Sequence, residues 1–428
     1  MWYRLSEQHR IRGKVSRCQA FSQIIDREMA TPTRKTVPHP SGGVYSPSVT
    51  CHNEIIFVSG QLGCINAPEN QTFQDECRAA MTKLQAVLEQ SQSSLALATM
   101  CTVYLTDITN YGEFNEVYKA MLVTTGANDA PPCRACFAIA ALPLNGRVEI
   151  ECEAITQAAA ATRQVVVPGV PNLFSAAVAG GRDRVVWVAG QLSMENGTLT
   201  GGDDVALQTT GALANVKSVL AQAGSSMSAI FRSTVFLTNM NQYAPMNEVY
   251  GTTLGLTGEN PSMLPPTRAA FAVTDLPLGG LVEIACVAAS SAEHNQTLPG
   301  LSAFPVYSPA VTTGIASKMV WISGQVALDP ASGTTELVGA GDVALETKQT
   351  LDNLKSVVEQ SGCAMESVLK VNIYCADMGE YGTINEVYSS YFGKQSPPAR
   401  ACVQVKELPL GARVEMSCVA VEVAGSGL

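Results

Sequence analysis

Charged residues are scarce in this chain of 428 residues: Asp, Glu, Lys and Arg make up 15% of it, against 46% hydrophobic residues. Acidic residues outnumber basic ones, 37 to 27, so the formal net charge is −10. Such a protein repels phosphate backbones overall, which disfavours nucleic-acid binding outside a local basic patch. The hydrophobic content is enough for sizeable cores and is not typical of a disordered chain.

Histidine is rarer still, with four copies, and no stretch of 18 apolar residues occurs that would cross a membrane. Neither a phosphate-binding P-loop nor the GxSxG motif of serine hydrolases is present. The 13 cysteines include one CxxC, at Cys133 and Cys136, without a second pair at zinc spacing. We therefore expect no bound metal, and free thiols in a reducing compartment.

Four short strings, in contrast, occur three times each and in the same order. Each copy opens with a string like VYSPSV, continues with SGQ or AGQ in an apolar run and then with NEVY, and reaches two prolines followed by an arginine. The arginines, Arg134, Arg268 and Arg400, recur at intervals of 134 and 132 residues. That period is too long for a solenoid unit, so each copy should fold as a domain.

The predicted domains are residues 38–158, 165–292 and 298–425, called repeats 1, 2 and 3 below. Residues 1–37 form an N-terminal extension, which we expect to be disordered or to serve targeting. The extension is basic, like an organelle-targeting peptide, but it carries acidic residues that such peptides avoid. The cytoplasm is therefore the expected compartment, with the mitochondrion as the alternative. Whether the first 28 residues belong to the mature protein is left open.

Within each repeat the pattern predicts an α+β unit. An apolar strand such as EIIFVSGQL should precede a long helix, whose buried face in repeat 1 should carry Cys77, Met81, Leu84 and Leu88. In repeat 3 the helix should start after an N-cap, and the expected residues are Asp342 as the cap and Leu345, Leu351, Leu354 and Val358 on the buried face. A second strand, a short helix with NEVY and two final strands complete the unit, with the helices on one face of the sheet.

Each arginine begins the first of the two final strands, and a glutamate follows 15 residues later on the second. If the two strands form a hairpin, Arg134 and Glu149 lie close together in repeat 1. One interpretation is a structural ion pair. The other is a ligand site, because arginine binds a carboxylate with two parallel hydrogen bonds and a glutamate of tuned pKa can activate a water. The local pattern leaves both interpretations open.

Taken together, the strings resemble the reactive intermediate deaminase family, also called YjgF-type or endoribonuclease L-PSP proteins, three times over from about residue 38 to 425. The resemblance implies a chorismate-mutase-like fold with a mixed sheet and two helices on one face. It also implies a metabolite damage-control hydrolase, which converts reactive 2-imino or enamine acids, such as 2-aminoacrylate, to 2-keto acids and ammonia in clefts between neighbouring units, without a cofactor. Three fused units would form an intramolecular pseudo-trimer, so we expect a monomer in solution.

The resemblance also implies which residues form the site. With Arg on the substrate carboxylate and Glu on a water, the catalytic set is Arg134, Glu149, Arg268, Glu283, Arg400 and Glu415. The substrate-binding set is Tyr45, Gly60, Asn115, Cys136, Phe174, Gly190, Asn247, Ala270, Tyr307, Gly324, Asn385 and Cys402. Repeat 2 departs most, since Phe174 lacks the hydroxyl of Tyr45 and Tyr307. The sequence does not say which repeats share a cleft.

Two alternatives stay open. A non-catalytic regulatory protein that binds small carboxylates would need the same arginines, and only the glutamates favour catalysis over it. An endoribonuclease acting on RNA is disfavoured by the acidic charge and by the absence of a histidine that recurs between repeats. The expected partners are therefore small 2-imino or 2-keto acids, with no membrane and no nucleic acid. The physiological substrate, and whether all three clefts are active, are left open.

Overall fold

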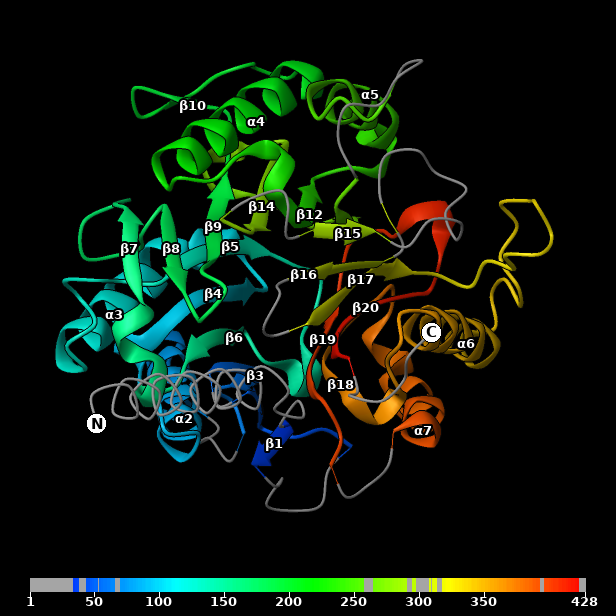
Figure 1. Cartoon of the computed structure of the whole chain (residues 1–428), viewed down its shortest axis with the longest axis horizontal. Helices are drawn as coiled ribbons and strands as arrows, with labels where there is room; N and C mark the ends of the chain where they lie inside the picture. The colour runs from blue at the N-terminus through cyan, green and yellow to red at the C-terminus, as the bar shows by residue number, and fades with distance from the viewer. Residues whose placement is uncertain are drawn as a thin grey trace, which may run out of the picture.

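The computed structural model describes residues 34–37, 44–52, 54–65, 70–257, 265–290, 295–297, 308, 310–313, 318–392 and 396–422. Three six-stranded sheets of the same topology stand in the middle of the molecule, and the long helices lie outside them (Figure 1). Each repeat is therefore an α+β unit, as the sequence predicts. The predicted position of Tyr307, and most of the N-terminal extension, lie outside the described residues.

The elements of repeat 1 are β1 (Arg34–Val37), β2 (Ser48–Cys51), β3 (Ile55–Leu62), α2 (Phe73–Gln90), β4 (Ala98–Leu105), α3 (Tyr111–Thr124), β5 (Cys133–Ala138) and β6 (Val148–Ile155). In the sheet they follow the order β1-β2-β3-β6-β4-β5. Neighbouring strands are antiparallel except β4 and β5, which are parallel. The sheet thus begins at Arg34, four residues before the predicted domain boundary.

Repeats 2 and 3 repeat this plan. Repeat 2 consists of β7 (Gln164–Val167), β8 (Ala177–Gly180), β9 (Val185–Gln191), the small ribbon β10 (Met194–Glu195) and β11 (Thr198–Leu199), α4 (Val205–Gln222), β12 (Ile230–Leu237), α5 (Tyr243–Thr253), β13 (Thr267–Ala272) and β14 (Val282–Ala288). Repeat 3 consists of β15 (Asn295–Thr297), β16 (Ala310–Thr313), β17 (Met319–Gln325), α6 (Val343–Gln360), β18 (Val368–Cys375), α7 (Tyr381–Tyr391), β19 (Ala399–Gln404) and β20 (Val414–Val421).

One predicted feature is wrong: the two final strands of a repeat do not form a hairpin. In each sheet a third strand separates them, β4 in repeat 1, β12 in repeat 2 and β18 in repeat 3. Arg134 pairs with Cys101 on β4, whereas Glu149 pairs with Tyr104 on the same strand, so the two lie on opposite sides of β4. The arginine and the glutamate of one repeat therefore have different neighbours.

The long helix of repeat 3 starts as the sequence predicts, at a side chain that caps the first turn. Asp342 accepts hydrogen bonds from the backbone N–H groups of Ala344 and Leu345 at the start of α6. The predicted apolar face of α2 is buried. In α6, however, Leu345 is 51% exposed, while Thr347 and Thr350 are buried among the predicted leucines. Leu345 lies in the first turn, outside the apolar core that includes Leu351 and Leu354.

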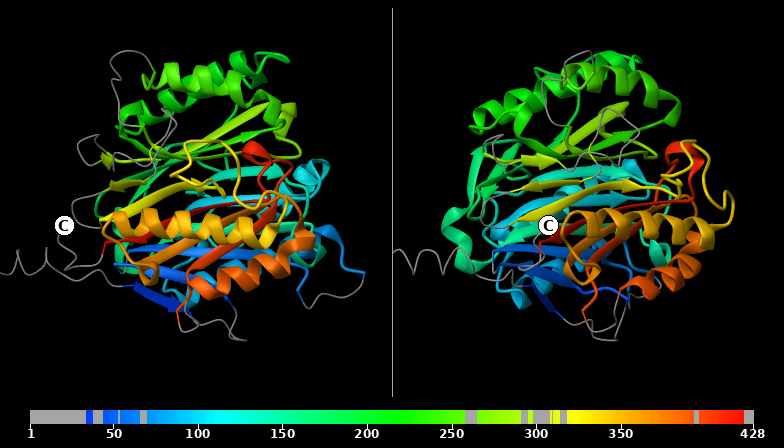
Figure 2. Two further views of the ribbon diagram at one scale, coloured as in Figure 1. Left: turned by 90° about the vertical axis from the view of Figure 1, so that its right-hand side faces the viewer. Right: turned by 45° about the vertical axis from the view of Figure 1, so that its right-hand side comes forward.

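Each sheet is covered on one face by its own two helices and on the other by the remaining sheets (Figure 2). Three apolar cores lie between sheets and helices, and a fourth lies where the three sheets meet. The shared core includes aromatic contacts between repeats, with ring centroids of Phe137 and Phe236 at 4.2 Å and of Phe271 and Tyr374 at 4.1 Å. Such contacts bury large apolar surfaces that a separate repeat would expose to water.

The repeats close into a ring because the opening segment of each docks on the double proline of another. Three backbone bonds, each 3.0 Å long, join N–H to C=O in this way: Ser175 to Pro132, Ser308 to Pro266 and Ser46 to Pro398. The serine hydroxyls repeat the pattern by donating to the carbonyls of Pro131, Pro265 and Pro397. Repeat 1 therefore contacts repeat 2, repeat 2 contacts repeat 3, and repeat 3 returns to repeat 1. That the chain is a monomer in solution stays a prediction.

Candidate active site

Arg134, Arg268 and Arg400 occupy the second position of β5, β13 and β19, and each is 4% exposed. Each arginine is therefore buried, although it stands near the start of its strand. An asparagine of the short helix accepts a hydrogen bond from Nη1 of each arginine, at 2.8 Å from Asn115, 2.6 Å from Asn247 and 2.5 Å from Asn385. The three asparagines of the predicted set thus position the arginines.

Tyrosines of the same helices complete the cradle of each arginine. Nη2 donates to the hydroxyl of Tyr111, Tyr243 and Tyr381 at 2.9, 3.0 and 2.9 Å respectively. A second tyrosine, one helical turn after each asparagine, lies under the guanidinium group. The distances from the guanidinium carbon to the ring centroids are 5.1, 5.0 and 5.1 Å for Tyr118, Tyr250 and Tyr388. These six tyrosines were not predicted from the sequence. Their signal is a tyrosine four residues before and three residues after each asparagine, which places all three side chains on one helix face.

Glu149, Glu283 and Glu415 lie on β6, β14 and β20, and each is 3% exposed. The glycine of the SGQ string stands directly against each of them. A Cβ atom at Gly60, Gly190 or Gly324 would lie 1.6, 1.7 or 1.8 Å from the Oε1 atom of that glutamate. Glycine is therefore required at these positions because any side chain would displace the carboxyl group.

The arginine of one repeat is an electrostatic neighbour of the glutamate of the next. Burial raises the pKa of Glu283 to about 8, and the charge of Arg134 opposes the rise. Burial likewise raises the pKa of Glu415 to about 8, against the opposing charge of Arg268. The pKa of Glu149 is raised well above its ordinary value by burial, then by Cys402 and Glu151, and Arg400 opposes the rise. The sites therefore lie at the 1–2, 2–3 and 3–1 interfaces.

The 2–3 cleft contains a cavity of about 420 Å³. Arg268 and Ala270 of repeat 2 line it together with Gly324 and Glu415 of repeat 3. Most of the remaining wall is apolar and includes Met240, Val326, Leu328, Leu408 and Leu410, and the polar side chains that also line it are Asn241, Tyr243, Lys406 and Glu407. This volume lies within the usual range for small-molecule sites, and the wall has the usual character: mostly apolar, with a few convergent polar groups.

The three clefts differ in the residue that faces the arginine from the next repeat. The ring of Phe174 lies 5.3 Å from the guanidinium carbon of Arg134, and that of Tyr45 lies 5.2 Å from that of Arg400. In addition, the backbone N–H of Arg400 donates to the Ser59 hydroxyl at 2.8 Å, and that of Arg268 to Ser323 at 2.9 Å. Ala189 stands at the equivalent position of the 1–2 cleft. Repeat 2 therefore contributes the least polar wall.

The two residues of the CxxC are both buried, Cys133 fully and Cys136 beside the Arg134 cleft. Burial raises the pKa of the Cys136 thiol to about 12, which disfavours a nucleophilic thiolate there. Among the described residues, no group of three His, Cys, Asp or Glu side chains could hold a metal ion. In that same part of the chain, no helix is long and apolar enough to span a membrane.

We predict that the chain loses stability as the pH rises from 5 to 8. Glu283 and Glu415 have pKa values raised from 4.5 to about 8, so the folded state retains protons that the unfolded state has released. The contribution of these two carboxyl groups to the free energy of unfolding is fully present below pH 4.5 and is lost as the pH rises through 8. The slope is up to about 1.4 kcal/mol per pH unit for each group. Urea unfolding at several pH values measures it, and a Glu283→Gln, Glu415→Gln variant should show a flatter profile. An equally steep profile in that variant would contradict the prediction.

A second prediction follows from the unequal clefts. Single Arg→Lys variants should reduce the turnover of a small 2-imino acid least when the substitution is Arg134→Lys. The 1–2 cleft lacks the hydroxyl of Tyr45, and one lost hydrogen bond weakens a site by about 0.5–1.5 kcal/mol, or several-fold. Steady-state rates of Arg134→Lys, Arg268→Lys and Arg400→Lys provide the comparison. Equal losses of about a third in each would show that Phe174 is immaterial.

A family model described as Endoribonuclease L-PSP matches this chain three times, over residues 36–156, 167–290 and 300–422. A 2-iminobutanoate/2-iminopropanoate deaminase of Mus musculus is 46% identical over 116 residues, which are 27% of this chain and 81% of the mouse protein. A RutC family protein of Synechocystis is 40% identical over 106 residues, 25% of this chain and 80% of that protein. The crystal structure of a chorismatase covers 76% of this chain and 93% of its own, with a TM-score of 0.51 and 14% identity, so it shows likeness of fold alone.

Proposed function

Because the chain belongs to the endoribonuclease L-PSP family over each of its three repeats, we propose that it hydrolyses 2-imino acids to 2-keto acids and ammonia in the clefts between repeats. The observation that supports this most strongly is the 2–3 cleft. A buried Arg268 and a buried Glu415, from different repeats, line one cavity of about 420 Å³ there. Relatives named as 2-iminobutanoate/2-iminopropanoate deaminases align with single repeats.

In this proposal the arginine binds the carboxylate of the substrate. Asn115 and Tyr111 take two of the five N–H donors of Arg134 and fix the plane of the guanidinium group. A fixed, charged fork matches the two oxygens of a carboxylate and orients the adjacent C=N bond. No side-chain nucleophile is needed, because an imine carbon is already electrophilic and a positioned water suffices.

The glutamate moves the protons. Water oxygen bonds to the imine carbon, and the carboxylate form of the glutamate takes a proton from that water. The resulting carboxylic acid returns that proton to nitrogen, which gives an intermediate with a hydroxyl and an amino group on one carbon. The carboxylate then takes the remaining hydroxyl proton and passes it to nitrogen, the C–N bond breaks, and ammonia leaves as the C=O bond of the 2-keto acid forms. A pKa near 8, as for Glu283 and Glu415, suits both the acceptance and the return of a proton near neutral pH.

The test is to generate 2-aminoacrylate with a serine dehydratase and to follow pyruvate release with and without this protein. We expect faster pyruvate release in its presence. Release at the same rate as the uncatalysed reaction would contradict the proposal. In that case a binding function would be favoured, since the arginine cradle alone suffices to bind a small carboxylate.

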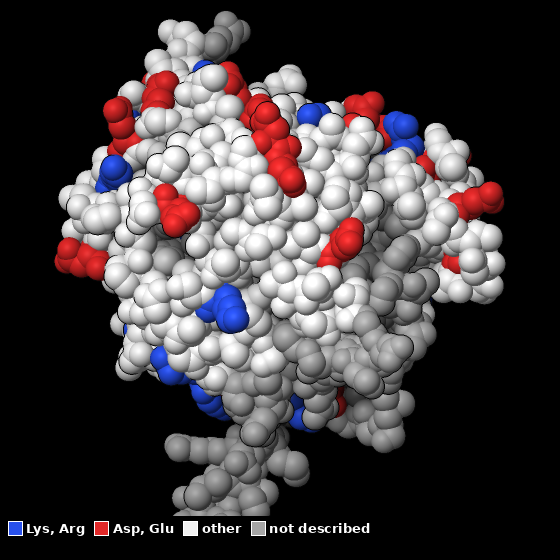
Figure 3. All heavy atoms as spheres, turned by 90° about the horizontal axis from the view of Figure 1, so that it is seen from above, with Lys and Arg blue, Asp and Glu red and all other residues white. Residues whose placement is uncertain are grey.

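RNA cleavage receives less support. Acidic and basic side chains on the face that carries α4 and α5 stand singly or in small groups, with wide uncharged areas between them (Figure 3). A protein that neutralises several phosphates needs clustered Lys and Arg side chains. The chain as a whole has a net charge of −10.

A further inference from the structure

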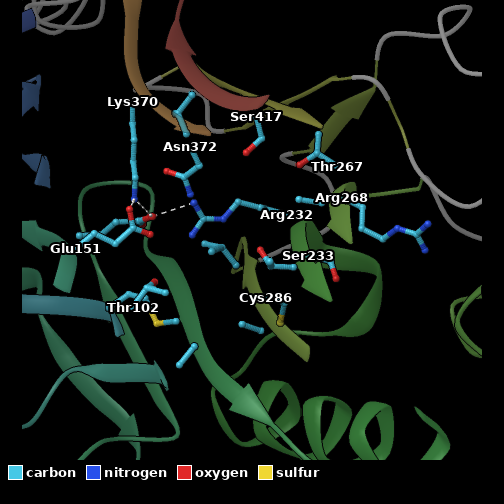
Figure 4. A pocket seen from close by; sticks show the side chains of 18 of the residues that line it. Thr102, Glu151, Arg232, Ser233, Thr267, Arg268, Cys286, Lys370, Asn372 and Ser417 are labelled. Carbon is cyan, nitrogen blue, oxygen red and sulfur yellow. Dashed lines mark hydrogen bonds and ion pairs between the residues drawn. The ribbon is translucent and has the colours of Figure 1, made fainter. Parts of the chain in front are cut away.

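A small cavity of about 70 Å³ lies where the three sheets meet, and it is separate from the clefts (Figure 4). Its charged lining comes from all three repeats: Glu151 and Glu153 of repeat 1, Arg232 of repeat 2 and Lys370 of repeat 3. Figure 4 shows Lys370 and Arg232 directed towards Glu151, whereas Arg268, which also lines the cavity, points away from them. None of these four charges takes part in the proposed reaction.

The four charged residues form one connected network. Nζ of Lys370 lies 3.1 Å from Oε2 of Glu151 and 3.9 Å from Oε1 of Glu153. Nη1 of Arg232 lies 2.8 Å from Oε1 of Glu153. The indole N–H of Trp187 donates to Oε2 of Glu153 at 2.6 Å. Tyr104 donates to Oε1 of Glu151 at 3.0 Å.

These residues occupy equivalent positions in the three repeats, as strand register shows. The first set of equivalent residues lies on β4, β12 and β18 and consists of Met100, Arg232 and Lys370. Each of them pairs with a residue on the last strand of its own repeat, and these partners are Glu153, Val287 and Val419 in the same order. Two residues earlier on that partner strand stand Glu151, Ala285 and Ser417. At these equivalent positions repeat 1 therefore carries two acidic residues, whereas repeats 2 and 3 each carry one basic residue.

A ring built from three copies of one repeat would bring like charges together at this cavity. Three copies of repeat 1 would gather six carboxyl groups from Glu151 and Glu153, while three copies of repeat 2 or 3 would gather three copies of Arg232 or Lys370. One copy of repeat 1 with two copies of the cationic repeats, as in the native chain, gives two carboxylates and two cations, whereas two copies of repeat 1 leave four carboxylates against one cation. Like charges placed together inside an interface cost several kilocalories per mole, which excludes wrong partners more strongly than it favours right ones.

We propose that this axial surface admits one copy of repeat 1 to a ring, excludes a second copy of repeat 1, and excludes rings made of repeats 2 and 3 alone. The network thus disfavours assemblies in which separate chains join through copies of repeat 1, or through their cationic repeats without it. Buried ion pairs generally add little to stability compared with apolar side chains, and their best-attested role is to select partners and register. Glu151, Glu153 and Lys370 are only 3–4% exposed. Their charges are therefore desolvated, as this role requires.

The test replaces the network in the full chain with residues that other repeats carry at the same positions. The neutral variant combines Tyr104→Phe, Glu151→Ala, Glu153→Val, Trp187→Phe, Arg232→Met and Lys370→Met. The two aromatic changes remove the hydroxyl and the N–H that would otherwise lose their acceptors. Native and neutral chains are refolded from denaturant over a range of protein concentrations, and sedimentation then measures the fraction at the monomer mass of 45.1 kDa.

We expect the native chain to refold to monomer, and the neutral variant to refold with native-like circular dichroism but with about tenfold more oligomer at high concentration. Equal monomer fractions would overturn the proposal, because selection would then not need the charges. Failure of the neutral variant to regain native-like circular dichroism would also overturn it, because the charges would then serve stability.

A matched variant moves the same pattern one repeat around the ring. It combines Met100→Lys, Glu151→Ser, Glu153→Val, Arg232→Met, Ala285→Glu, Val287→Glu, Lys370→Arg and Ser417→Ala. Trp321 stands in repeat 3 where Trp187 stands in repeat 2, so the moved carboxylate keeps an indole donor. We expect this variant to refold to monomer like the native chain. More oligomer than in the native chain would overturn the proposal, because individual positions and not the pattern would matter.

Discussion

Simultaneous replacement of Glu149, Glu283 and Glu415 by glutamine is expected to lower the rate of 2-aminoacrylate hydrolysis by about 10²–10⁴-fold, the usual contribution of a general acid–base group. Glutamine keeps the shape of the side chain against the facing glycine but neither accepts nor returns a proton. The chain should stay folded, because burial already favours the neutral form of these carboxyl groups. Pyruvate release in the serine dehydratase assay measures the loss.

The control is the affinity of the same variant for pyruvate, measured by calorimetry. Because the arginines and their cradles are unchanged, we expect the dissociation constant to stay within about twofold of the native value. Loss of rate with retained affinity separates proton transfer from binding. A variant that hydrolyses the imine as fast as the native chain would show that the glutamates are not catalytic, and would favour the binding-only alternative.

Replacement of Arg134, Arg268 and Arg400 by lysine is expected to weaken pyruvate binding by about 10–100-fold, since hydrogen bonds to charged groups contribute roughly 1.5–3 kcal/mol. Lysine retains the positive charge but lacks the planar fork that fits a carboxylate. Lysine is preferred to alanine here because the arginines are buried and hydrogen-bonded to asparagine and tyrosine. Alanine would leave a cavity and unpaired polar groups, and both destabilise a fold.

Circular dichroism and urea unfolding of the lysine variant serve as the control for folding. A folded triple variant with native affinity for pyruvate would make the three arginines structural and would contradict the proposed carboxylate site. The same calorimetry is done with chloride and phosphate. Weaker binding of pyruvate to the variant, without a comparable loss for chloride or phosphate, would support selective recognition of a carboxylate by the arginine fork.

The repeated strings predicted much of the fold. Helix starts such as Asp342 and the apolar face of α2 follow from local capping and periodicity, and the structure confirms both. The burial of Leu345 was mispredicted, because periodicity describes one helix and not what the rest of the chain places against it. The six-stranded sheets are made of these local elements, but their strand order depends on contacts between distant segments.

The site shows the same division. Arg134 and Glu149 stand out in the sequence because their type and spacing recur in every repeat. Their partners do not follow from spacing, because β4 separates them within the repeat and the ring brings Glu283 to Arg134 instead. The role of Asn115 as a support for Arg134 depends on where a helix packs against a sheet, which the sequence does not contain.

The most direct measurement asks which glutamate serves which arginine. One chain keeps Arg400 and Glu149, which belong to different repeats, and carries Arg134→Lys, Arg268→Lys, Glu283→Gln and Glu415→Gln. Its matched control keeps Arg400 and Glu415, which belong to one repeat, and carries Arg134→Lys, Arg268→Lys, Glu149→Gln and Glu283→Gln. With independent clefts the first chain should retain about a third of the native imine hydrolysis rate, and the second should fall about 10²-fold or more below it. Because the second chain keeps Glu415 opposite the lysine of Arg268→Lys, its residual activity is read at low substrate concentration, where weaker carboxylate binding lowers the rate. Higher activity in the second chain than in the first would contradict a site shared between repeats.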